Sequence, residues 1–232
     1  MAVIGLVLVI IFILIAIFAP WIAPYHYNDQ NLRNTWQPPS AEHIFGTDDL
    51  GRDQLSRVIY AVRTAAIVGL GASALSLLIG AVIGSISGMR GGWTDTILMR
   101  LVEIFNSFPA ILLAVILATN LGQSVTTIVI ALAITGWAGY ARLIRGQVLA
   151  LKNQEYVHAA RTLGASEQHV ITKYVLPNIL GPIAVALSFG IPYAMIAEAG
   201  LSVIGVGIRP PEPSWGNLIQ LGINKMRGFP YL

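Results

Sequence analysis

The sequence contains no cysteine, and Asp, Glu, Lys and Arg together make up only 11% of its 232 residues. The missing thiols exclude a disulfide framework, thiol catalysis and a thiolate metal site. The shortage of charge argues against a soluble domain, because soluble domains carry roughly 25% charged residues. The formal net charge of +3 is too small to indicate a nucleic-acid partner.

The sequence also has no phosphate-binding loop of the GxxxxGK[ST] kind and no evident nucleophile–base pair. Three carboxylates lie close together at Asp48, Asp49 and Asp53, but they lack the alternating ligands and distant Glu of a calcium loop. We therefore expect a chain that is not an enzyme and that binds no metal or cofactor itself.

Long apolar runs are what the sequence does have. About 20 apolar residues cross a hydrocarbon core of about 30 Å, so each run predicts a spanning helix. The first run has no Lys or Arg before it and no small-residue cleavage site after it, which predicts an uncleaved anchor. The sequence predicts an all-α polytopic membrane protein with about five spans, at residues 3–19, 65–87, 97–120, 125–141 and 179–208.

A polar segment separates the first two runs. Thr47 is a plausible helix N-cap, with Asp48 and Asp49 in the first turn. The spacing predicts helical ion pairs from Asp48 to Arg52 and from Asp53 to Arg57. We expect three parts: an N-terminal spanning helix at 1–24, an extracytoplasmic loop with an amphipathic helix at 25–64, and a membrane domain at 65–232.

Several residues inside the spans are unusual there. Gly80, Gly84 and Gly88 recur at a spacing that predicts close helix packing. Glu198 is an ionisable group within an apolar run, where such groups are costly. We expect it either to face a transport path and meet a substrate amine, or to pair with a partner protein. Asn106 and Ser107, beside Pro109, line such a path or bond between helices.

The distribution of Lys and Arg predicts the orientation. Residues 142–173 contain five of them in 32 residues, whereas residues 24–63 contain four in 40 together with five acidic residues. Because positive residues favour the cytoplasm, the 142–173 segment is predicted inside and the 24–63 loop outside. The N-terminus is then also inside.

The stretch EYVHAARTLGA, residues 155–165, lies in this predicted cytoplasmic segment. On a helix, Ala159, Ala160, Leu163 and Gly164 would share one small, nearly flat face. Gly164 suits a left-handed helix end, and Ser166 can cap a second helix. Such a face suits a groove on another protein better than a lipid surface.

The longer stretch EYVHAARTLGASEQHVITKYVLPN resembles the cytoplasmic "EAA" loop of ABC-importer permeases. In that family the loop forms a coupling helix that docks on an ATPase subunit. By position, the motif's Ala-Ala and Gly places fall on Ala159, Ala160 and Gly164, and its closing Leu-Pro falls on residues 176–177. His158 replaces the motif's Glu, and Tyr174 replaces a frequent His. The resemblance implies ATPase coupling by residues 155–177, with contacts at Glu155, His158, Ala159, Ala160, Arg161, Leu163 and Gly164.

Three further stretches, HIFGTDDLGRDQLSRVIY, GWAGYARLIRGQV and RPPEPSWGN, resemble the second permease of the dipeptide, oligopeptide and nickel branch. The resemblance extends from the first span to Asn217 and implies the type I importer fold with six spans. Five are visible here, so we expect the sequence to be incomplete at its C-terminal end.

The resemblance implies an inner-membrane permease subunit of a bacterial or archaeal importer for peptides. Its implied partners are a second homologous permease, two ATPase subunits that hold ATP-Mg, an extracytoplasmic binding protein and the lipid bilayer, with no nucleic acid. The alternatives are a nickel or metal-chelate permease of the same branch and, from another class, an ion-driven secondary transporter. A secondary transporter would usually show paired internal repeats, and none is convincing here.

Overall fold

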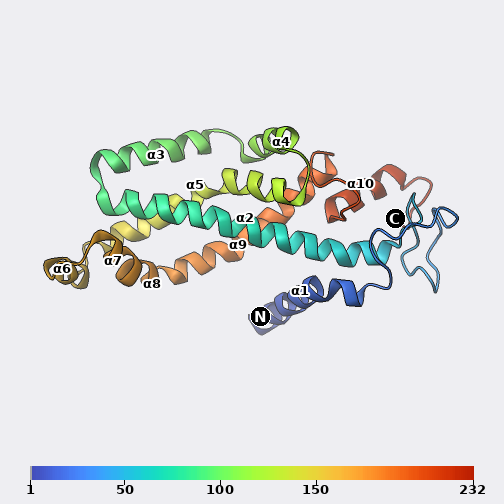
Figure 1. Ribbon diagram of the computed structural model, residues 1–232, viewed down its shortest axis with the longest axis horizontal. Coiled ribbons are helices and arrows are strands. Elements are labelled where there is room, and N and C mark those ends of the chain that lie inside the picture. Colours follow the sequence, from blue (N-terminus) through green and yellow to red (C-terminus); the bar gives the residue numbers. More distant parts are fainter. Residues whose placement is uncertain (1) are drawn as a thin grey trace. The chain divides into compact units, whose positions relative to one another are not determined.

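The structure is a computed structural model that describes residues 2–232, apart from the side chains of Ala2 and Arg161. Within this part the chain is helical, and its one β-type pairing is an isolated bridge between Thr47 and Asp53. The helices follow one another as Figure 1 shows. They are α1 (Ala2–Ile22), α2 (Gln54–Arg90), α3 (Gly92–Ser107), α4 (Ala110–Leu121), α5 (Val125–Leu151), α6 (Glu155–Thr162), α7 (Glu167–Val170), the π-helix η1 (Ile171–Val175), α8 (Leu176–Asn178), α9 (Leu180–Val203) and α10 (Trp215–Lys225).

Four helices are long and apolar enough to cross a membrane: α1, α2, α5 and α9. The helices α3 and α4 meet at an 83° bend and count as a fifth span if they are taken together. Pro109 lies at the bend, where it cannot continue the hydrogen-bond ladder of α3. The expected all-α membrane fold with about five spans is confirmed.

The predicted start of the second helix was wrong. Thr47 does not cap it; α2 begins at Gln54, and Asp53 accepts a hydrogen bond from the Ser56 N–H at 2.7 Å. Gly51 has a φ of +69°, a left-handed conformation that interrupts a helix. From Gln54 the helix then continues to Arg90, so the expected boundary at residues 64–65 falls inside it.

Two compact units make up the chain. Unit 1 contains the segment up to Gly71, Val115–Val129 and Ala194–Leu232; unit 2 contains Ala72–Ala114 and Ile130–Tyr193. In unit 1, the polar loop between α1 and α2 folds around Asp48, which accepts hydrogen bonds from the N–H groups of Leu50 and Arg52 at 2.9 Å. Asp48 and Arg52 are paired at 2.7 Å as expected, but in this turn rather than on a helix.

The second predicted pair in the loop does not form. Asp53 lies 2.9 Å from the Nδ1 atom of His43, and Arg57 approaches Asp48 at 3.3 Å instead. The reason is that Asp53 stands at the N-terminus of α2, where its carboxylate turns back to the helix N–H groups.

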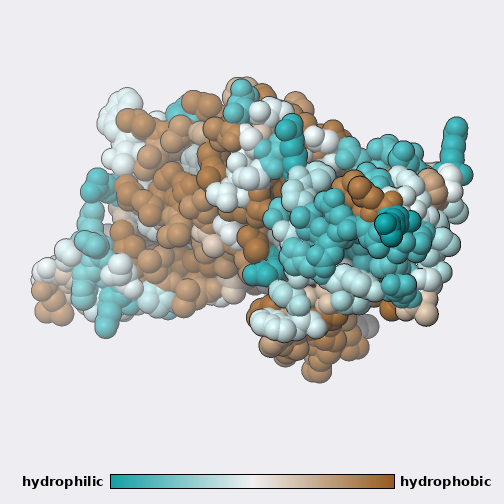
Figure 2. All heavy atoms as spheres, turned by 45° about the vertical axis from the view of Figure 1, so that its right-hand side comes forward, coloured by the Kyte–Doolittle hydropathy of each residue, from teal (hydrophilic) through white to brown (hydrophobic). Residues whose placement is uncertain are grey.

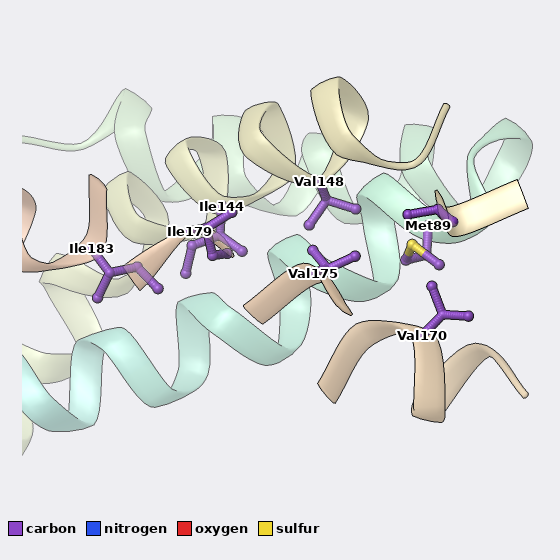
Figure 3. Close-up of a cluster of buried hydrophobic side chains, with 8 residues drawn as sticks. Met89, Ile144, Val148, Val170, Val175, Ile179 and Ile183 are labelled. Carbon is purple, nitrogen blue, oxygen red and sulfur yellow. The ribbon is translucent and has the colours of Figure 1, made fainter. Parts of the chain in front are cut away.

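In unit 2, α2 and α5 pack closely. A Cβ atom placed on Gly80 would lie 2.6 Å from Cβ of Tyr140, and one on Gly88 would lie 2.8 Å from Cβ of Val148. These distances are too short for a side chain, so the prediction of close packing at the glycines is confirmed. The core of the unit is a buried cluster from α2, α5 and the short helices, most of which Figure 3 shows: Met89, Ile144, Val148, Val157, Val170, Val175, Ile179 and Ile183.

Candidate functional site

The segment from α6 to α8 lies between α5 and the first part of α9, at one end of unit 2 (Figure 1). Its inner side is fixed by apolar contacts. Val157, Val170 and Val175 are fully buried in the cluster, and Ala160 is 6% exposed. The segment is therefore a packed part of the unit, although most of its other side chains face outward.

The end of α6 has the form that the sequence predicts. Gly164 has a φ of +86°. The Ala165 N–H donates to the Ala160 carbonyl at 3.0 Å, as in the glycine-ended helix motif that satisfies terminal carbonyls. Ser166 then caps α7 by accepting from the His169 N–H at 3.3 Å. The helix–Gly–helix form of the segment is confirmed.

The predicted flat face of α6 is partly exposed and partly buried. Leu163 is 88% exposed, and Ala159 and Gly164 are exposed too, but Ala160 is buried. Ala160 shares the inner face with Val157, because residues three apart lie on the same side of a helix. The outward surface is accordingly made by Glu155, His158, Ala159, Leu163 and Gly164. The side chain of Arg161, also predicted to couple, lies outside the described residues.

Polar contacts join this segment and the end of α5 to α2. The Nζ group of Lys152 donates to the Gly88 carbonyl at 3.0 Å, and Arg90 lies 3.5 Å from Glu167. Arg145 forms a two-point pair with Asp95, with N–O distances of 2.5 and 2.6 Å. Arg145 was predicted only as one of the positive residues of the 142–173 segment, and Asp95 was not predicted as its partner.

The three polar residues predicted inside the spans are satisfied locally. Glu198 is 1% exposed within unit 1 and accepts a hydrogen bond from the Ser202 hydroxyl at 2.6 Å. Glu198 therefore has a partner within its own helix, and its two expected roles, toward a substrate amine and toward a partner protein, stay predictions. Asn106 and Ser107 are exposed and donate to the carbonyls of Val102 and Glu103 in their own helix, not to another helix.

The chemistry of the segment is that of a docking surface. No group of three or more His, Cys, Asp or Glu side chains that could hold a metal occurs among the described residues. What the segment offers is a small, exposed helix with an apolar tip at Leu163, held on a rigid base. A helix of this kind can enter a groove of another protein and transmit its displacement to α5 and α9.

Comparison with known proteins identifies the family. Residues 80–232 match the family model described as binding-protein-dependent transport system inner membrane component. The chain belongs to this family. Residues 1–39 also match the N-terminal TM domain of oligopeptide transport permease C. The chain is thus a multi-pass inner-membrane protein and a permease of an ABC importer.

Two relatives and one solved structure are similar to the chain over most of its length. The oligopeptide transport system permease protein OppC of Bacillus subtilis is 44% identical, covering 100% of this chain and 76% of that protein. The dipeptide transport system permease protein DppC of the same organism is 40% identical, covering 96% of this chain and 70% of that protein. The inward-facing MetNI methionine ABC transporter has a TM-score of 0.60 at 17% identity, covering 76% of this chain and 82% of the other. This likeness shows the fold, that of a type I ABC importer permease.

Proposed function

We propose that this permease imports peptides. With a second related permease it forms the path for peptides that an extracytoplasmic binding protein delivers. Two separate ATPase subunits bind ATP-Mg and hydrolyse it, and their movement reaches the path through residues 155–177. The relatives named for oligopeptide and dipeptide transport support the choice of peptides.

The exposed outer face of α6 on its buried base is the observation that carries the coupling role. Leu163 is 88% exposed, so its apolar side chain is available to enter an apolar groove of a partner protein. On the inner side of the same helix, Val157 packs into the cluster shared with α5 and the start of α9, and Ala160 is buried. A push on the outer face is therefore carried to the spanning helices rather than absorbed by a loose loop.

The orientation follows from the charges. The 142–173 segment, with five Lys and Arg residues, faces the cytoplasm and the ATPases. The polar loop between α1 and α2 and the loop that contains RPPEPSWGN then face outward, toward the binding protein. In a transport cycle, ATP binding draws the coupling segments together, and the permease exchanges inward-open and outward-open states.

Reconstitution tests the proposal. The permease, its permease partner and the ATPases are placed in proteoliposomes, and uptake of a labelled tripeptide is measured with and without the binding protein and ATP. Uptake that needs both supports peptide import. Uptake of nickel, but not of peptide, would indicate the metal branch of the family. Uptake driven by an ion gradient without ATP would contradict the whole proposal.

A further inference from the structure

Unit 1 contains a cavity of about 370 Å³ at the outward-facing loops, and neither the coupling role nor the family match assigns a purpose to it. Its wall comes from the polar loop before α2, the turn before α5, the loop after α9 and helix α10. Hydrophilic side chains gather over this part of unit 1, as Figure 2 shows. The volume lies within the range of small-ligand sites, about 300–1,000 Å³.

The cavity is cationic. Three guanidinium groups line it, from Arg52, Arg57 and Arg209, against a single lining carboxylate, Asp49. One further carboxylate, Asp48, lies behind the wall and is shared, at 2.7 Å from Arg52 and 3.3 Å from Arg57. Even with both carboxylates counted, the groups at the cavity carry an excess positive charge, which favours an anionic ligand.

Arg57 carries the strongest sign of a missing partner. It is 2% exposed, yet its Nε and Nη1 atoms have no hydrogen-bond partner among the described residues. The approach of Nη1 to Asp48 at 3.3 Å lacks hydrogen-bond geometry. A buried guanidinium with free donors is unfavourable unless a ligand or water satisfies it. Both atoms are enclosed in the wall, so Arg57 contributes positive charge to the cavity rather than open donors.

Arg209 is held at the rim. Its backbone N–H donates to the Gln123 carbonyl at 3.1 Å, and its Nε group donates to the side-chain oxygen of Gln123. The guanidinium is exposed but anchored, so it can meet an entering anion before Arg57 does. The amides of Gln220 and Asn224 also line the cavity, and they supply donors and acceptors that suit peptide groups.

We propose that this cavity is a carboxylate-binding site that receives the C-terminal end of a short peptide. Arg209 binds the carboxylate at the rim, the charges of Arg52 and Arg57 in the wall attract it, and the amide side chains bond the adjoining peptide group. The inference rests on the proposed peptide function and on the outward orientation of unit 1. It adds a peptide contact within one permease.

Binding of labelled dialanine to the reconstituted importer complex, without the binding protein, tests this. We expect dialanine to bind about tenfold more tightly than its C-terminal amide, since the amide cannot form the charge-assisted pair. N-acetyl-dialanine, which keeps the carboxylate, should bind like dialanine. Arg209→Gln should remove the preference for the acid over the amide.

Arg33→Gln is the matched control, because Arg33 is exposed in the same polar loop and does not line the cavity. Equal binding of acid and amide by the unaltered complex, or an unchanged preference in Arg209→Gln, would overturn the inference. If inorganic phosphate or acetate competes as well as dialanine, the cavity is a general anion site and the peptide assignment is wrong. Peptide uptake is measured on the same preparation and tests the proposed function separately. Uptake without discrimination between acid and amide would contradict only the cavity site. Discrimination without uptake would contradict only peptide import.

Discussion

At the residue scale, Asp95 connects three helices of unit 2. It lies in the first turn of α3, pairs with Arg145 of α5 at 2.5 and 2.6 Å, and accepts a hydrogen bond from Ser87 of α2. Its side chain is 18% exposed and that of Arg145 is 30% exposed, so water screens the pair only partly. The pair holds α5 beside the α2–α3 turn, and the coupling segment starts after the end of α5.

We predict that Asp95→Asn destabilises the permease by about 1.5–3 kcal/mol, the range for hydrogen bonds to charged groups. The amide keeps the size of the side chain but leaves Arg145 without its counter-charge. Thermal unfolding in detergent measures the loss. Glu167→Gln is the control, because Glu167 lies 3.5 Å from Arg90 and both side chains are exposed, at and beyond the end of the spanning helix α2. Such pairs contribute about 0–1 kcal/mol, so an equal loss in both variants would contradict the role given to Asp95.

The structural role of a residue was predictable from the sequence where that role depends on its neighbours along the chain. Gly164 and Ser166 act through their own backbone neighbours, and the structure has both as expected. Asp95 and Arg145 are 50 positions apart, so their pairing depends on how α3 and α5 pack. Thr47 does not cap α2 for a different reason. Gly51 has a left-handed conformation, so the helix begins only after it. From the sequence alone, it could not be predicted which of several possible capping residues would precede the helix.

At the element scale, the contact between α2 and α5 depends on glycine. We predict that Gly80→Ala costs about 1–3 kcal/mol, because the new Cβ would lie 2.6 Å from Cβ of Tyr140 and 2.8 Å from the backbone nitrogen of Ala141. Gly139→Ala is the matched control: Gly139 is also helical, and nothing lies within 4 Å of its Cβ position. There the alanine should be neutral or stabilise the helix by up to about 1 kcal/mol. Chemical unfolding of the two variants separates the effects, and the opposite order would refute close packing at Gly80.

The outer face of α6 gives a second prediction at this scale. Leu163→Asp should leave stability within about 0.5 kcal/mol, because the side chain is 88% exposed. It should nevertheless lower peptide-stimulated ATP hydrolysis of the reconstituted complex about tenfold or more, since an apolar contact with the ATPase becomes a buried charge. Gln30→Asp, at an exposed position of the loop before α2, should change neither quantity. Unaltered coupling in Leu163→Asp would argue against docking through α6.

The helices themselves were predictable because long apolar runs and charged turns determine them. It was harder to predict which side of a short helix packs against the rest of the protein. The Ala-Ala pair in α6 spans two directions, so the sequence did not say which alanine packs inward; the neighbouring Val157 places Ala160 with it. The continuity of α2 through residues 64–65 agrees with the sequence, in which nothing polar lies between Thr64 and Ser73.

At the scale of the whole molecule, the account depends on which side of the membrane the 155–177 segment faces. The family and the fold are established by the match over residues 80–232 and by the relatives at 40–44% identity. Charge distribution alone supplies the orientation, and the difference between the two segments is modest. The proposed coupling to ATPases through residues 155–177 requires this segment to face the cytoplasm.

The chain's lack of cysteine makes the most direct test possible. Leu163→Cys places one thiol on the exposed face of α6, and a second thiol is placed in the groove of the candidate ATPase. The account predicts a disulfide crosslink in membranes whose yield changes when ATP or ADP is added. Absence of any crosslink, together with labelling of the Leu163→Cys thiol by a membrane-impermeant maleimide from outside, would contradict the orientation and the coupling role together.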